Sequence, residues 1–207
     1  MEIIISKNQN GFTLAELLIA MMLSLIVLGA VYGVYRVQVH TVKAQEFKME
    51  AQEYARAALD IMVREVRNLG FFPAGTPCPA PGNTAGIVTA TATTFQFVYD
   101  ANNDGSCAGT MATGAGADEN ITYAYNGTDI TRDINDGNGA QILTAGNVTA
   151  FVITYLDAAG VVTANPANIR SLSITLTVRA RNPDAQFGGP QNITMNSNVN
   201  LRNRGNA

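Results

Sequence analysis

Residues 11–35 read GFTLAELLIAMMLSLIVLGAVYGVY, and this stretch decides the fold. The run from Leu17 to Tyr35 holds 19 residues without a charge, enough for a helix to cross a bilayer core of about 30 Å. No proline precedes Pro73, so no residue of this part forces a helix to break. The pattern predicts a single helix from about Phe12 to Leu69, roughly 85 Å long at ~1.5 Å per residue.

The second half of this helix is polar but keeps apolar residues at helical spacing. They form a stripe of Phe47, Ala51, Tyr54, Ala58, Ile61, Met62, Val66 and Leu69. Residues 12–35 therefore suit lipid, and residues 36–69 suit packing onto a domain. Gly29 and Gly33 form a G-x-x-x-G pair in the first half. The pair either lets another helix approach closely or only loosens the helix.

The composition limits the classes of protein to consider. The chain has 207 residues, a net charge of −3 and 47% hydrophobic residues, so residues 70–207 are long enough for one compact domain beyond the helix. The small acidic charge argues against nucleic-acid binding. The charged fraction of 14% is low, and the segment after Phe72 is rich in Gly, Ala, Asn and Thr. This composition favours a secreted β-rich domain over a cytosolic enzyme.

Strand patterns follow the helix. The predicted strands are Thr94–Tyr99, Asn120–Tyr125, Thr128–Arg132, Val148–Leu156, Arg170–Arg181 and Asn192–Leu201. Asn126-Gly127 is a strong hairpin turn. Apolar residues alternate on one face of the fifth strand, at Leu172, Ile174, Leu176, Val178 and Ala180. We therefore predict an α+β fold, in which the long N-terminal helix covers the buried face of an antiparallel sheet.

The start of the helix resembles a known processing site. Gly11-Phe12-Thr13-Leu14-Ala15-Glu16, followed by the apolar run, is similar to the cleavage motif of type IV prepilins. The resemblance implies that residues 1–11 are a leader, that a prepilin peptidase cuts between Gly11 and Phe12, and that the new amino terminus is methylated. It also implies an inner-membrane anchor in a bacterium, with the C-terminal domain outside the cytoplasm and later in a pilus at the cell surface.

Glu16 is unusual because it is an acid at the start of an apolar helix. A carboxylate costs about 2.5 kcal/mol or more at the bilayer centre, so a partner is expected. One interpretation is that Glu16 lies at the membrane interface and favours the positive end of the helix dipole. The resemblance implies another, in which Glu16 pairs with the Phe12 amino group of a neighbouring subunit. Such a pair would fix the register of subunits in a filament core.

The end of the helix resembles one group of minor pilins. Ala57-Ala58-Leu59-Asp60, then Glu65-Val66-Arg67, Gly70-Phe71 and Cys78 follow the order found in PilW-type minor pilins. This resemblance implies a structural protein that primes assembly of a type IV pilus and joins its tip complex. The implied partners are other minor and major pilins, an inner-membrane assembly platform, a tip adhesin and, before assembly, membrane lipid. The J-type pseudopilins of type II secretion are similar here and remain an alternative.

Cys78 and Cys107 are the only cysteines. Two cysteines in an exported chain predict a disulfide, which would close a loop of about 30 residues and stabilise the fold by roughly 3–4 kcal/mol. Two free thiols are the alternative.

Asp100-Ala101-Asn102-Asn103-Asp104-Gly105 matches the opening of a calcium-binding loop. The closing glutamate of such a loop is missing, so Asp118 or Glu119 would have to reach back from beyond it. Calcium ligands would then be Asp100, Asn102, Asp104 and Glu119, and the region could act as an adhesive, calcium-dependent module at a pilus tip. The alternative is an ordinary turn, because Asp, Asn and Gly are common in turns.

Catalytic motifs do not emerge from the sequence. His40 is the only histidine, and no nucleophile motif or phosphate-binding loop occurs. We therefore expect a protein that is not an enzyme and has no certain cofactor.

Overall fold

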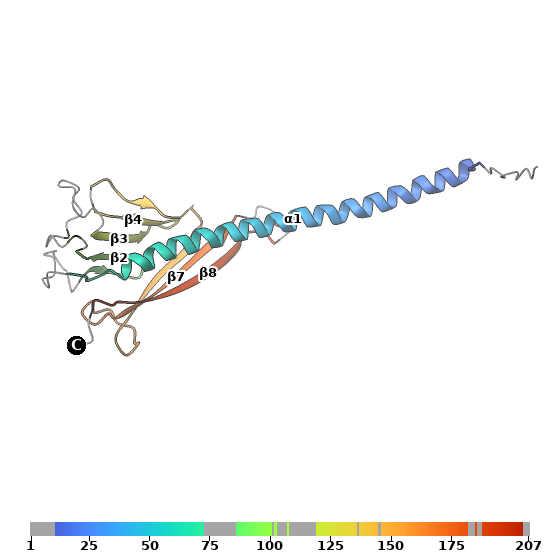
Figure 1. Ribbon diagram of the computed structural model, residues 1–207. Helices are drawn as coiled ribbons and strands as arrows, with labels where there is room; N and C mark the ends of the chain where they lie inside the picture. The colour runs from blue at the N-terminus through green and yellow to red at the C-terminus, as the bar shows by residue number, and fades with distance from the viewer. Residues whose placement is uncertain are drawn as a thin grey trace, which may run out of the picture.

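A computed structural model describes residues 11–72, 86–100, 102, 107, 119–135, 137–144, 146–181, 185 and 188–204. One long helix, α1 (Leu14–Val66), carries a β-rich head on its second half (Figure 1). The first half projects away from the head, and its side chains are exposed with respect to the other residues that the structure describes. The predicted α+β architecture, a long apolar N-terminal helix packed on antiparallel strands, is confirmed.

Helix α1 begins and ends slightly inside its predicted limits. Thr13 is the N-cap and Arg67 the C-cap. After the helix, the backbone makes hydrogen bonds of the 3₁₀ type between residues three apart; for example, Leu69 N–H donates to Val66 O at 3.1 Å. Gly70 has a φ of 70° and donates its N–H to Val98 O of the head. The helix therefore ends where a residue with a left-handed conformation turns the backbone toward the sheet.

The buried face of α1 differs in part from the predicted stripe. Its buried residues are Ala51, Ala55, Ala58, Leu59, Met62 and Val66, and Leu69 is buried just beyond the helix. Tyr54 and Ile61, which the pattern placed on this face, are 43% and 37% exposed. The reason is that alanines at 51, 55 and 58 face the strands and allow a close approach, so the contact stripe follows the small residues.

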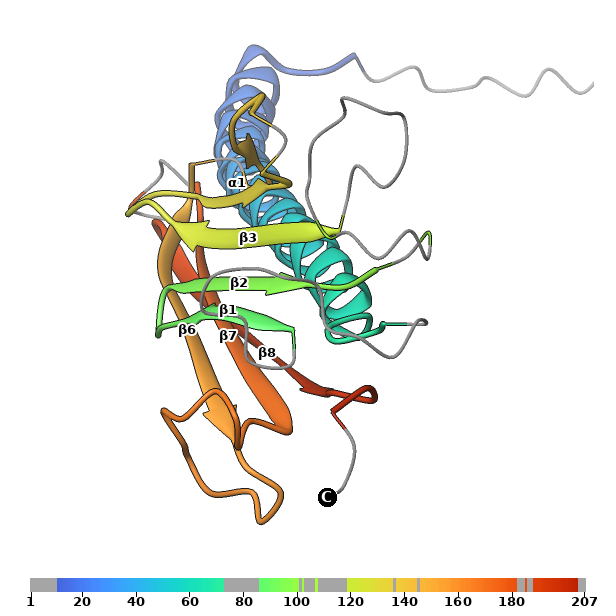
Figure 2. The same ribbon diagram turned by 90° about the vertical axis from the view of Figure 1, so that its left-hand side faces the viewer.

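Within the described residues the strands form two antiparallel sheets, whereas one was predicted. Sheet A has the order β1 (Ile87–Ala90), β2 (Thr94–Val98), β3 (Asn120–Tyr125), β4 (Ile130–Asp133), β5 (Gln141–Ile142). Sheet B has the order β6 (Val148–Leu156), β7 (Ser171–Ala180), β8 (Gln191–Asn200). Figure 2 shows both sheets beside the helix. β1 and β5 were not predicted, and the other strands lie within two residues of their predicted limits.

The β3–β4 hairpin has a longer loop than a two-residue Asn-Gly turn. Tyr125 pairs with Ile130, so residues 126–129 form the loop. Asn126 Oδ1 accepts the N–H groups of Thr128 at 3.0 Å and Asp129 at 2.8 Å. Gly127 supplies the positive φ of 102° that the loop requires. The Asn126 side chain holds residues 128 and 129 in the turn, and β4 therefore starts at Ile130 rather than Thr128.

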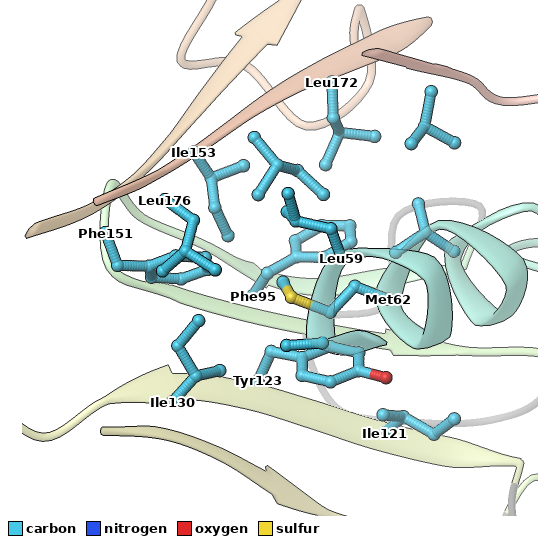
Figure 3. Close-up of a cluster of buried hydrophobic side chains, with 14 of the residues drawn as sticks. Leu59, Met62, Phe95, Ile121, Tyr123, Ile130, Phe151, Ile153, Leu172 and Leu176 are labelled. Carbon is cyan, nitrogen blue, oxygen red and sulfur yellow. The ribbon is translucent and has the colours of Figure 1, made fainter. Parts of the chain in front are cut away.

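One hydrophobic cluster joins the helix and both sheets (Figure 3). Met62 and Leu59 of α1 lie among Phe95 and Tyr123 of sheet A and Leu172 of sheet B. The predicted inward face of β7 is confirmed, because Leu172, Ile174, Leu176, Val178 and Ala180 are all buried. Sheets A and B are also linked directly, since the Tyr155 hydroxyl donates to Thr91 O at 2.7 Å.

Candidate processing and assembly site

The segment of the prepilin-like motif that the structure describes, Gly11 to Glu16, is exposed. Phe12 is 90% exposed. A Cβ atom added to Gly11 would meet no other atom within 4 Å, so the fold itself does not require glycine at this position. A requirement for glycine would then come from recognition by another protein. Residues 1–10 of the predicted leader lie outside the described residues.

Glu16 and Thr13 form a capping box at the start of α1. Glu16 Oε2 accepts the Thr13 N–H at 2.9 Å and the Thr13 hydroxyl at 3.0 Å, and Thr13 Oγ1 accepts the Glu16 N–H at 3.3 Å. The sequence analysis missed this cap, although the Thr-x-x-Glu spacing indicates it. In a single chain, the Glu16 carboxylate and the Thr13 hydroxyl thus each satisfy one free N–H group at the start of the helix. Its pairing with Phe12 of a neighbouring subunit stays a prediction.

The first half of α1 is long and apolar enough to cross a membrane, and none of its most apolar 18 residues is buried. Gly29 and Gly33 lie in this half, and an added Cβ atom at either would meet nothing within 4 Å. Such an apolar surface is costly in water at about 25 cal/mol per Å². The exposed half is consistent with anchoring in the inner membrane.

A partly buried ion pair fixes the head to the second half of α1. Arg132 of β4 donates to Glu65 of α1 from Nη2 at 2.8 Å and from Nε at 3.0 Å. The Tyr123 hydroxyl of β3 donates to the same carboxylate. Burial, and next the hydrogen bond to Glu65, raise the pKa of Tyr123 above its ordinary value. No local pattern predicts this cluster, because Glu65 and Arg132 are 67 residues apart.

The predicted calcium ligands lie between β2 and β3. Asp100 and Glu119 are both buried, and Glu119 Oε1 accepts the Asn102 N–H at 3.1 Å. Glu119 thus reaches back to the loop. Asp104 lies outside the described residues, and the part of the chain that the structure describes contains no group of three acids, histidines or cysteines suited to a metal ion. The calcium site stays a prediction beside the alternative of an ordinary turn.

Cys107 is disulfide-bonded and buried beside Val98. Cys78 lies outside the described residues, so its pairing with Cys107 stays a prediction.

Comparison with known proteins locates similarity at the N-terminus. A family model described as the prokaryotic N-terminal methylation motif matches residues 6–32. No curated protein and no solved structure matches the chain. The matched residues include the Gly11-Phe12 bond, Glu16 and the apolar half of α1 up to Tyr32. The match supports a type IV pilin-like or pseudopilin-like protein, which in general interacts with a prepilin peptidase and with other pilins.

Proposed function

We propose that this chain is a PilW-type minor pilin, a structural component that helps prime type IV pilus assembly and joins the tip complex. It would be cleaved between Gly11 and Phe12, held in the inner membrane by the first half of α1, and then moved into the filament. Its partners would be other minor and major pilins, the assembly platform and a tip adhesin. The role is structural rather than enzymatic.

The observation that carries this proposal is the division of α1 into two halves. The half that the methylation motif covers up to Tyr32 is apolar and unburied, whereas the half from Ala51 onward packs under the head. A soluble enzyme has no use for an apolar half-helix that its own domain leaves uncovered. Lipid can cover it first, and neighbouring helices can replace the lipid in a filament.

Some residues of the PilW-type pattern dock the head, whereas Ala57, Asp60 and Phe71 are exposed. Ala58 and Leu59 are buried against the strands. Glu65 binds Arg132, and Gly70 donates its N–H to Val98 O. These roles explain why such a pattern would serve a helix that carries a β-rich head. They apply equally to a J-type pseudopilin, which is therefore kept as the second candidate.

Intact mass of the full chain from bacterial envelopes tests the processing step. We expect a mass that lacks residues 1–11 and carries one added methyl group. Gly11→Val should leave the precursor uncut. Gly29→Val is the matched control, because both glycines have open space around them, and this variant should be cut normally. A wild-type chain that stays uncut in cells with an active prepilin peptidase would overturn the proposal.

Co-purification separates the two candidate filaments. A PilW-type protein should be recovered with other minor pilins of a type IV pilus, and its deletion should reduce the number of surface pili. A J-type protein should instead be recovered with pseudopilins, and its deletion should stop secretion without loss of pili. Recovery of neither set would contradict a role in filament assembly.

A further inference from the structure

Three arginines gather at one end of sheet B. They lie around a cavity of about 480 Å³, between the connection from β6 to β7 and the chain that follows β8. We call this cavity the arginine pocket; its polar lining includes Arg170, Arg202, Arg204, Asp157, Ser171 and Asn200. The volume is within the range of about 300–1,000 Å³ that is typical of small-molecule sites.

Two of the guanidinium groups lie close together, and their hydrogen bonds to described residues go to carbonyl oxygens. Arg170 Nη1 donates to Ala167 O at 2.8 Å, and Arg204 Nη2 donates to the same oxygen at 3.4 Å. Arg204 Nη1 donates to Pro166 O. Arg204 is only 6% exposed. Two positive charges thus share one neutral acceptor, and one of them is buried.

Among the described residues, the lining of the pocket carries more positive than negative charge. Asp157 is the acidic residue in its lining, and Asp157 Oδ1 already accepts the N–H groups of Ala159 and Val161, both at 2.9 Å. Among the residues that the structure describes, no carboxylate pairs with any of the three arginines. A buried charge without a partner is costly. Consistently, burial and then the charge of Arg170 lower the pKa of Arg204.

We propose that the arginine pocket binds an oxyanion, a phosphate or carboxylate group, between Arg170, Arg202 and Arg204. The planar guanidinium fork matches the two oxygens of such groups. Three arginines facing one aspartate favour a doubly charged phosphate over a singly charged carboxylate. An anion held there would offset the repulsion between Arg170 and Arg204.

The position of the pocket indicates where the ligand comes from. Asn203, which follows the β8 strand, donates its side-chain N–H to Leu69 O at 3.2 Å, just beyond the C-terminal end of α1. The pocket is lined by the connection from β6 to β7 and by the chain after β8, and these segments lie on the side of the head away from the apolar half of α1 (Figures 1 and 2). Anionic lipid around the apolar half would be too distant, so the ligand approaches from the outer end of the head.

Calorimetric titration of the full chain in an uncharged detergent tests the proposal. Inorganic phosphate, glycerol 1-phosphate and acetate are compared at constant ionic strength. We expect saturable binding of phosphate, with acetate weaker. Tighter binding of glycerol 1-phosphate would indicate a phosphate borne by a larger ligand, and equal or weaker binding would indicate free phosphate. No saturable binding of any of the three would overturn the proposal.

Two variants and a control assign the binding to the pocket. Arg170→Gln and Arg202→Gln should each weaken phosphate binding at least tenfold. Arg202 is exposed and makes no hydrogen bond to another described residue, so Arg202→Gln should fold normally even if a change at Arg204 does not. The matched control is Arg56→Gln on an exposed position of α1, which should bind as the wild type does. An equal loss in Arg56→Gln would show a general effect of charge and refute the site.

Discussion

Removal of the Arg132 side chain should loosen the head from α1. Arg132→Met keeps an apolar side chain of similar length but leaves the Glu65 carboxylate with only the Tyr123 hydroxyl in this cluster. Removing one partner of a buried pair costs about 3–5 kcal/mol. The side chains of Arg132 and Glu65 are 12% and 19% exposed, so water can partly solvate the carboxylate that Arg132→Met leaves without its partner. We therefore expect a loss of about 2–4 kcal/mol in the free energy of unfolding.

Urea unfolding of the full chain in uncharged micelles, followed by near-ultraviolet circular dichroism of the tyrosines, measures this loss. Arg64→Met is the matched control, because Arg64 is exposed and directly precedes Glu65, so its side chain leaves the helix about 100° away from that of Glu65. Arg64→Met also removes one positive charge, here from α1 rather than from β4, and should change the free energy of unfolding by less than about 0.5 kcal/mol. The triple variant Glu65→Leu, Arg132→Met, Tyr123→Phe removes the whole polar cluster.

The triple variant decides between two explanations of the loss. If the cost of Arg132→Met comes from an uncompensated carboxylate, the triple variant should regain most of the stability and lie within about 1 kcal/mol of the wild type. If Arg132→Met unfolds at the same urea concentration as Arg64→Met, the ion pair contributes nothing and our reasoning about head docking is refuted.

Three further predictions concern packing, backbone and pH. Met62→Ala should cost about 2–5 kcal/mol in urea unfolding because Met62 is fully buried, whereas Ile61→Ala, on the exposed flank, should cost much less. Gly86→Ala should lower the free energy of unfolding by about 1–3 kcal/mol, because Gly86 has a φ of +96° and the new Cβ atom would lie 2.6 Å from a backbone nitrogen. Gly160→Ala, at a positive φ but with open space around it, should lower it less in the same assay. Because the pKa of Tyr123 is raised in the fold, its contribution to stability should be complete below pH ~10 and should decline as the pH rises further, by up to about 1.4 kcal/mol per pH unit. In unfolding experiments across pH 9–12, the free energy of unfolding of Tyr123→Phe should therefore decline less steeply than that of the wild type. An unchanged slope would contradict this assignment.

Local patterns were sufficient for the helix and for the main strands. The absence of proline before Pro73 and the apolar run to Tyr35 predict one long helix. The strict alternation along β7 predicts its buried face, because side chains of a strand point to opposite sides in turn. The methylation motif is likewise contained in a short stretch, residues 6–32.

Weak local signals explain the missed and misplaced features. β5 has only two residues, Gln141 and Ile142, both exposed, and its pairing with β4 depends on the sheet already being in place. Tyr54 and Ile61 fit a helical stripe by spacing, but the close approach of alanines to the strands turns them toward solvent. Hydrophobic spacing alone does not fix the rotation of a helix about its axis.

The sequence by itself determined the long two-part helix, the prepilin-like start and an antiparallel β-rich head. Each depends on residues within a few turns or one strand of each other. Only the tertiary structure decided the division into two sheets, the Glu65–Arg132 link and the meeting of Arg170 with Arg204. These features join residues tens of positions apart, and which distant side chains meet depends on how the strands pack against the helix.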